Sequence, residues 1–106
     1  NRAEANYFLG NTADALADLN LIRTRSGLTA STTLTGAALL AEIYRQRRLE
    51  FGFEGQRWFD LKRTGQNVVK AAGQGGGLVY TDFRILANIP INELSTNKSI
   101  RQNFGY

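Results

Sequence analysis

The chain has 106 residues, of which 42% are hydrophobic and 21% are charged, and these proportions are ordinary for a single globular domain. It contains no cysteine and no histidine, which removes disulfides, thiolate chemistry and the commonest general base and metal ligand. The net charge of +4 permits an acidic partner without requiring one. No run of about 18 apolar residues occurs, so no segment has the length of a membrane-spanning helix.

Two short helices are predicted at the start of the chain. Residues 1–9 read as a helix that ends at Gly10, a residue type favoured just after a helix C-terminus. Asn11 is the expected N-cap of a second helix over residues 12–25, and Gly27 follows its end. The residues expected to face inward from this second helix are Leu16, Leu19 and Ile22. Two antiparallel helices joined by Gly-Asn form a helical hairpin, the unit from which helical repeats are built.

A longer helix is predicted after the small, hydroxyl-rich loop LTASTTLTG, with Thr33 or Thr35 as its N-cap. Its apolar stripe is expected to consist of Leu39, Ile43, Leu49 and Phe53. We expect this helix to end near Phe53, because Gly55 follows and glycine costs about 1 kcal/mol relative to alanine inside a helix.

A short helix over residues 56–64 is predicted to complete a second hairpin. Trp58 and Leu61 lie one turn apart on it, so both are expected to face inward. We therefore expect Phe53, Trp58 and Leu61 to pack the two helices of this hairpin together.

The C-terminal part of the chain is predicted to be irregular. Residues 73–77 hold four glycines and indicate a surface turn, because the Lys-Ser/Thr of a phosphate-binding loop does not follow. Residues 78–80 and 83–86 are expected to be extended. A single helical turn over residues 91–94 is predicted, with Asn92 as its cap. The tail that follows is expected to lie as a strap against the helices, with Ile100, Phe104 and Tyr106 as its anchors.

Several aromatic residues outside the helices have two interpretations. Tyr80, Phe83 and Tyr106 are candidates for stacking on sugar rings, since aromatic side chains provide flat apolar faces. Packing in the core or under the strap is the interpretation that we favour for each of them, because single aromatic residues are usually buried.

The charged residues around Gly55 also admit two interpretations. Glu50 and Glu54 lie four residues apart and could act as the acid and base of a glycoside hydrolase. Alternatively, Arg47 pairs with Glu50, and Arg57 pairs with Glu54 and Asp60 at helical spacing. We favour this second alternative because such ion pairs are common in helices. The predicted structural network consists of Arg47, Glu50, Glu54, Arg57, Asp60 and Trp58.

A nucleic-acid surface is a further alternative for this basic and aromatic stretch, but we do not favour it. Acidic residues are interleaved among the basic ones, whereas a phosphate-binding stripe shows one sign of charge. The amphipathic pattern explains the aromatic residues as core. We therefore expect no nucleic-acid partner.

The string RQRRLEFGFEGQRWFDLKRTG resembles the ERR-x-E-[LF]-x-FEG-x-R-[WF]-x-DL-x-R motif of the SusD/RagB family of Bacteroidetes outer-membrane lipoproteins. The upstream ALADLNLIRTRSGL resembles the family's AL-x-x-LN-x-IR-x-R-[AS]-G helix, and IPINEL with the final NFGY resembles PIP-x-x-E-[IL] followed by QNPGY. The likeness covers nearly the whole chain in the right order. The departures are Gln46 in place of the usual Glu, Phe104 in place of the usual Pro, and Ala87-Asn88 in place of a Trp-Pro-like pair.

This resemblance implies a mostly α fold of two tetratricopeptide-like helical hairpins with an irregular C-terminal strap. It implies that residues 1–106 are one C-terminal segment of a longer protein, lipid-anchored through its N-terminus at the extracellular face of the outer membrane. Members of the family bind oligosaccharides or other nutrients, work with a TonB-dependent transporter, and are not enzymes. No cofactor and no metal are implied, and no ligand-binding residue carries over to this chain.

Two further expectations follow. The runner-up function is a helical-repeat scaffold that binds another protein on a concave helix face. Because about three repeats are needed for a stable array, two hairpins alone are expected to be marginal and to associate with a second copy.

Overall fold

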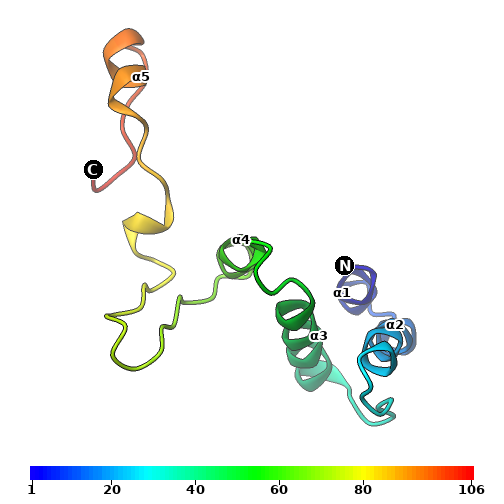
Figure 1. The fold of residues 1–106 in the computed structure, drawn as a ribbon. Coiled ribbons are helices and arrows are strands. Elements are labelled where there is room, and N and C mark those ends of the chain that lie inside the picture. The colour runs from blue at the N-terminus through cyan, green and yellow to red at the C-terminus, as the bar shows by residue number, and fades with distance from the viewer. The chain divides into compact units, whose positions relative to one another are not determined.

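A computed structural model describes all of residues 1–106; it is mostly helical, as the sequence predicts, and it has no β-strand. The chain forms two compact units, Asn1–Gly55 and Gln56–Tyr106. None of its helices has both the length and the apolar composition needed to cross a membrane. The elements are α1 (Arg2–Phe8), α2 (Thr12–Arg25), α3 (Gly36–Glu50), α4 (Gln56–Arg63), the 3-10 turn η1 (Phe83–Ile85) and α5 (Ile91–Thr96) (Figure 1).

The first predicted hairpin is present as α1 and α2. Gly10 turns the chain between them with a positive φ of 82°, a conformation that glycine adopts without a steric penalty. Its N–H donates to the carbonyl of Tyr7, and the N–H of Asn11 donates to Asn6, so the last carbonyls of α1 are satisfied. Asn11 is the N-cap of α2, as predicted.

A side-chain cluster ties the two helices of this hairpin together. Arg2 on α1 donates from Nε to Oδ2 of Asp18 on α2 at 2.8 Å, and Asn6 donates to the same oxygen at 3.2 Å. The hydrogen bonds from Arg2 are the main reason that the pKa of Asp18 is lowered from its ordinary value. These hydrogen bonds to Asp18 therefore hold α1 against α2.

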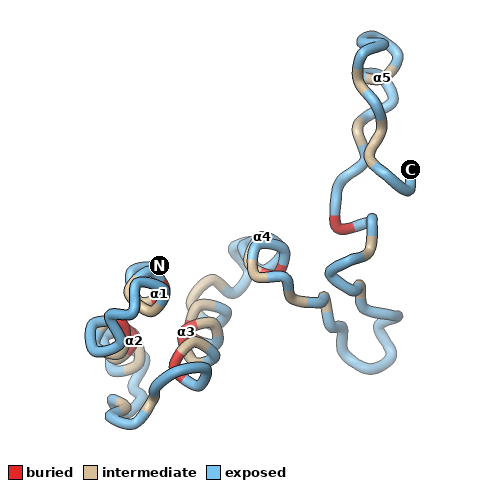
Figure 2. Tube along the Cα trace, turned by 180° about the vertical axis from the view of Figure 1, so that it is seen from behind, coloured by how far each residue is buried: buried red, intermediate tan, exposed pale blue.

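The third helix, α3, packs against both α1 and α2, and the core of the first unit lies between them (Figures 1 and 2). The buried residues of this core are Ala15, Leu19, Leu39 and Ile43. Burying a leucine side chain contributes about 1.5–3 kcal/mol relative to leaving it exposed. Ala3, Tyr7, Leu16 and Leu34 pack around these residues and are partly buried.

The loop between α2 and α3 is fixed by one amide side chain. Asn20 donates from Nδ2 to the carbonyl of Ser31 and accepts from the N–H of Ser31 with Oδ1, both at 2.8 Å. Thr35 is the N-cap of α3, one of the two residues predicted for this position, although its side chain makes no capping hydrogen bond. The two hydrogen bonds to Ser31 therefore hold this loop against α2.

The apolar stripe predicted for the long helix is only half right. Leu49 is 61% exposed, whereas Gln46 is only 3% exposed and lies on the inward face. The reason is the helical period: positions 39, 43, 46 and 50 share one face at 3.6 residues per turn, and position 49 does not. The last two turns of the inward face are therefore polar.

The end of α3 also differs from the prediction, because the helix stops at Glu50 and not near Phe53. Two glycines, Gly52 and Gly55, lie within the five residues that follow and weaken the helix. Phe53 has a positive φ of 67° and is fully exposed. Its predicted packing on Trp58 and Leu61 would join the two units and stays a prediction.

The second unit begins with α4, which matches the predicted short helix to within one residue and buries Leu61. Gly65 ends it with a φ of 66°. The chain then forms one antiparallel bridge between Val68 and Leu78, with N···O distances of 2.8 and 2.9 Å, which closes the predicted glycine-rich loop. A Cβ at Gly77 would lie 2.1 Å from the carbonyl oxygen of Val68, so only glycine fits there.

Residues 83–86 were expected to be extended, but Phe83–Ile85 form the turn η1. The carboxylate of Asp82 accepts from the N–H of Arg84 at 2.9 Å, and this local bond favours a turn over an extended chain. Ile85 is buried as a result.

Helix α5 is longer than the single predicted turn, and its cap is Pro90 and not Asn92. The carbonyl of Pro90 accepts from the N–H groups of Glu93 and Leu94 at 3.0 and 3.3 Å, so the helix starts one residue after the proline. The carbonyl of Asn92 instead accepts from the hydroxyls of Ser95 and Thr96.

The C-terminal strap is irregular, as predicted, but within the second unit it lies against residues 86–89. Gln102 binds both the N–H and the carbonyl of Ile89, at 2.8 and 3.0 Å, and Asn103 donates to the carbonyl of Ala87 at 2.6 Å. Phe104 is 90% exposed and is therefore not the anchor that was expected. Polar side chains thus hold the strap together with Tyr106, an expected anchor whose ring packs on Phe83.

Candidate functional site

The charged residues at the end of α3 are paired between helices. Glu50 accepts a hydrogen bond from Arg25 at the end of α2 and a longer one, 3.4 Å, from the hydroxyl of Ser26. Arg47, its predicted partner, donates instead to the side chain of Asn1, and its guanidinium lies 4.8 Å from the centre of the Phe51 ring. The predicted contact within one helix is thus replaced by a contact that joins α2 to α3.

The remaining members of the predicted network lie near or beyond the boundary of the units. Asp60 pairs with Arg63 at 3.1 Å, three residues later on α4, and not with Arg57 as predicted. Glu54 belongs to the first unit and Arg57 to the second, so their predicted pairing stays a prediction. Trp58 lies on α4 and is partly exposed, and its role as a structural residue likewise stays a prediction.

A second charge cluster, which the sequence did not reveal, joins the last turn of α2 to the middle of α3. The carboxylate of Glu42 accepts from Arg23 on α2, from Gln46 at 2.9 Å and from Arg45 at 3.5 Å. Arg23 and Glu42 are mostly buried, with 18% and 14% of their side chains exposed. Arg23 also donates to the carbonyl of Thr29. Arg23 and Glu42 are 19 residues apart, so no local spacing predicts that they pair.

A hollow of about 300 Å³ lies in the first unit beside the Arg25–Glu50 pair, and residues of α1, α2 and α3 line it. Glu50 lines it together with Arg25, and Glu54 does not line it. Hydrolysis of a glycoside requires two carboxylates that flank one bond in an open cleft. The observed arrangement instead places a guanidinium on Glu50, which is a structural use of the carboxylate.

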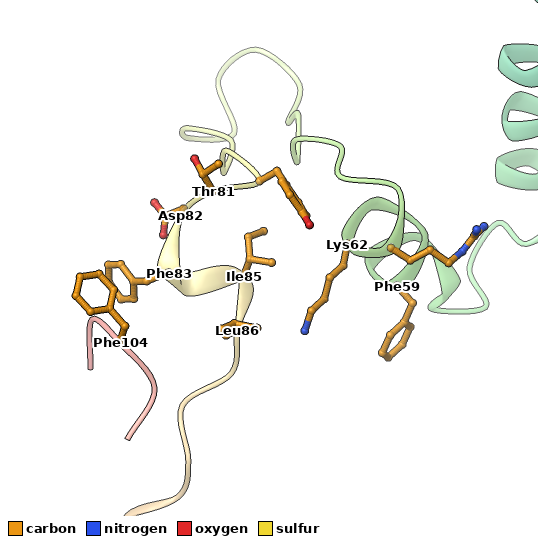
Figure 3. Close-up of a pocket in the computed structure, with 10 residues that line it drawn as sticks. Phe59, Lys62, Thr81, Asp82, Phe83, Ile85, Leu86 and Phe104 are labelled. Atoms are coloured by element: carbon orange, nitrogen blue, oxygen red, sulfur yellow. The ribbon is translucent and has the colours of Figure 1, made fainter. Parts of the chain in front are cut away.

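A larger hollow, of about 1130 Å³, lies within the second unit (Figure 3). Phe59 and Lys62 reach it from α4, and Lys62 extends into the space that faces η1 (Figure 3). The opposite wall is formed by residues 80–83, 85 and 86, and Phe104 contributes from the C-terminal tail. This hollow contains two of the three aromatic residues that the sequence singled out for sugar stacking, Tyr80 and Phe83.

The Phe83 ring in this hollow is held from two sides. Tyr106 meets it edge to face, with the ring centres 5.2 Å apart and the planes at 84°, and donates its hydroxyl to the carbonyl of Leu86 at 2.9 Å. Gly105 lies so close that a Cβ built on it would be 2.4 Å from Cγ of Phe83. The tail therefore supports the ring closely.

An ion pair flanks the same ring, with Cζ of Arg84 6.0 Å from the centre of the Phe83 ring. The carboxylate of Asp82 accepts from Nε of Arg84 at 2.9 Å and from Nη2 at 2.8 Å, in addition to the backbone bond. These hydrogen bonds, first those from the side chain of Arg84 and then the one from its N–H, lower the pKa of Asp82 to about 2. The carboxylate is thus ionised at every pH at which proteins normally work.

Taken together, the α1–α2 hairpin and its packing on α3 through interhelical ion pairs define a mostly helical fold of the tetratricopeptide-like kind. The family model described as the SusD family matches residues 1–106. This chain therefore belongs to the SusD family.

One curated relative is the starch-binding protein SusD of Bacteroides thetaiotaomicron. It is 34% identical over 112 aligned residues, which cover 99% of this chain and 19% of the relative. The chain thus spans about a fifth of the length of the relative that it matches. No solved structure matches it significantly.

Proposed function

We propose that this chain is the scaffold part of a cell-surface protein that binds a glycan or a related nutrient and takes part in its uptake. The observation that carries the proposal is the match to the SusD family over the whole chain, together with 34% identity to a starch-binding protein. We further propose that the protein is a lipoprotein at the extracellular face of the outer membrane and works with a TonB-dependent transporter, as the family resemblance implies.

The geometry of the first unit supports the part of scaffold. Of the two carboxylates that a hydrolase would use, Glu50 is engaged by Arg25, and Glu54 does not line the hollow beside it. A further carboxylate of α3, Glu42, is engaged by Arg23 and Gln46. The residues of the family motif in this unit therefore hold helices together. We propose on this basis that the chain is not an enzyme.

A chimera tests the proposal directly. In the starch-binding relative, the segment that this chain matches is replaced by residues 1–106, and binding is measured by affinity electrophoresis in a gel that contains starch. A scaffold segment supplies the same packing surfaces, so we expect the chimera to be retarded as strongly as the parent protein.

Two controls make the result decisive. A second chimera that carries Glu50→Gln and Glu54→Gln should still bind starch, and neither chimera should release sugar from it. A chimera that shows the helical circular dichroism of the parent but migrates as if no starch were present would overturn the scaffold proposal. Copurification of the chimera with the transporter that serves the relative tests the proposed partner.

The expected self-association is a separate proposal for the isolated chain. Several large apolar side chains of the first unit are exposed, Phe8, Leu9, Leu21, Leu49 and Phe53 among them. Exposed apolar area of this kind favours association. Light scattering at increasing protein concentration should show a mass above 11.7 kDa, and a constant monomer mass would contradict the proposal.

A further inference from the structure

We propose that Phe83 and the adjacent Asp82–Arg84 ion pair form a subsite that binds one pyranose ring of a glycan. The inference rests on the proposed glycan-binding function and assigns part of it to a position in this chain. It goes beyond the scaffold part argued above, since it gives the second unit a ligand contact of its own.

The first requirement of such a subsite is a fixed apolar face. Phe83 is 38% exposed and lines the hollow of the second unit, while two residues of the tail, Gly105 and Tyr106, lie against it. Because those two contacts are made by the hydrogen-bonded tail, the ring is ordered before any ligand arrives. A ring ordered in advance loses little conformational freedom on binding, which favours affinity.

The second requirement is a set of hydrogen-bonding groups beside the face. The carboxylate of Asp82 offers about four lone-pair positions, of which the N–H, Nε and Nη2 of Arg84 occupy three. The guanidinium of Arg84 has five N–H donors, and two of them are used in this pair. The pair therefore retains one acceptor and three donors beside the ring, and the Arg84 side chain is 60% exposed to a ligand.

A pyranose ring matches both features. Its axial C–H groups form an apolar face that packs on the negatively polarised face of an aromatic ring. Its neighbouring hydroxyl groups donate and accept hydrogen bonds, as the carboxylate and the guanidinium do in return. The net charge of the pair is zero, so the site favours a neutral polyol with a ring face over an anion such as a phosphate.

Protein-observed NMR of the 106-residue chain tests the subsite, with maltohexaose as the probe. We expect amide shifts at residues 80–86 and 104–106 that grow with maltohexaose concentration and saturate in the millimolar range. Sorbitol, which has hydroxyl groups but no ring face, should cause no shifts at these positions. Two variants, Phe83→Leu and Asp82→Asn, should each weaken binding by fivefold or more, and a double variant should abolish it.

The matched control is Phe8→Leu, which alters an exposed phenylalanine of the first unit and should leave the titration unchanged. Since Phe83→Leu could also loosen the tail, retention of the shift of the Tyr106 amide in that variant shows that the fold of the tail persists. If the tail is lost, Asp82→Asn decides, because it does not touch the Phe83 ring.

Three outcomes would overturn the subsite: no shifts with maltohexaose, equal shifts with sorbitol, or shifts confined to residues 1–55. None of them bears on the chimera described above, whose starch binding depends on the relative's own site. A functional chimera together with an unresponsive chain would reject this subsite alone. A chimera that fails to bind starch would instead reject the scaffold proposal.

Discussion

Arg25 and Glu50 lie 25 residues apart in the chain, and their side chains pair at the adjoining ends of α2 and α3. Arg25 is the last residue of α2, and Glu50 is the last residue of α3. The pair therefore fixes where the end of one helix lies against the next. Within the family motif, this acidic residue is used between helices and not within one.

The first prediction concerns the strength of this pair. A double-mutant cycle with Arg25→Ala and Glu50→Gln should give a coupling energy of about 0.5 kcal/mol, because both side chains are partly exposed and solvent screens them. The measurement is urea denaturation of the four proteins. The same cycle with Arg47→Ala in place of Arg25→Ala should give coupling near zero. Equal coupling in both cycles would show that Glu50 interacts with its own helix instead.

The second prediction separates the two leucines of α3 that were both placed on the inward stripe. Leu39→Ala should lower the free energy of unfolding by about 3 kcal/mol, since it leaves a cavity in the core. Leu49→Ala removes the same atoms from an exposed side chain and should change it by at most about 0.5 kcal/mol. Similar losses for the two variants, measured by urea denaturation, would contradict the observed face of the helix.

The third prediction concerns Gln46, which stands where the family motif usually has glutamate. Gln46→Glu would place a buried carboxylate against the Glu42 oxygen that now accepts a hydrogen bond at 2.9 Å. At pH 7 we expect a loss of about 2 kcal/mol from the lost bond and the buried charge. The matched control is Gln56→Glu, at the exposed start of α4, which should be neutral or slightly stabilising near the helix N-terminus.

The pH dependence of this variant gives an additional check. Burial and the neighbouring carboxylate raise the pKa of the introduced carboxyl in the folded state above its unfolded value of about 4.3. A raised carboxyl pKa means that the loss is present at high pH and shrinks as the pH falls through the folded-state value. A loss that is constant from pH 8 to pH 5 would show that charge is not its cause.

The fourth prediction concerns the titration of Asp82. The hydrogen bonds from Arg84 lower its pKa to about 2, whereas an unperturbed aspartate titrates near pH 3.9. A lowered carboxyl pKa stabilises the folded turn at every pH above the unfolded value, and this contribution is lost as the pH falls from about 4 to about 2. Carboxyl-detected NMR should follow this titration directly. In Arg84→Gln the midpoint should move up toward its ordinary value, and an unchanged midpoint would exclude Arg84 as the cause.

The fifth prediction compares two glycines that both have positive φ. Gly105→Ala and Gly75→Ala place alanine at φ values of 92° and 80°, so each carries a backbone strain of about 1 kcal/mol or more. Only at Gly105 does the new Cβ also meet the Phe83 ring, at 2.4 Å, while the space around Gly75 is open. The NOE contacts between the rings of Phe83 and Tyr106 should disappear in Gly105→Ala and persist in Gly75→Ala. Persistence in both variants would show that the tail does not support the ring.

The helices of the first hairpin were predictable because their signals are local. Gly10, Asn11 and Gly27 mark the ends of α1 and α2, and the bounds of α2 agree with the prediction. The short helix after Gly55 was also found from its neighbouring residues. The stripe on α3 was misassigned at Leu49 because the apolar spacing there does not follow the 3.6-residue period.

The candidate subsite shows the opposite case. Tyr80 and Phe83 were recognisable as aromatic residues outside the helices, but nothing in their spacing predicts that Gly105 and Tyr106 return to support Phe83. The turn at Asp82 forms because its carboxylate accepts from the N–H of Arg84, and this local bond prevails over the β-prone residues that follow. That signal, an aspartate two residues before a bonded N–H, is present in the sequence.

The sequence by itself determined the helical class, the ends of the first hairpin and the family. These depend on residues close together in the chain and on short motifs. Only the tertiary structure decided which charges meet between helices: Arg23 with Glu42, and Arg25 with Glu50. The physical reason is that a salt bridge between helices depends on how the helices pack, and packing brings together residues that the chain keeps far apart.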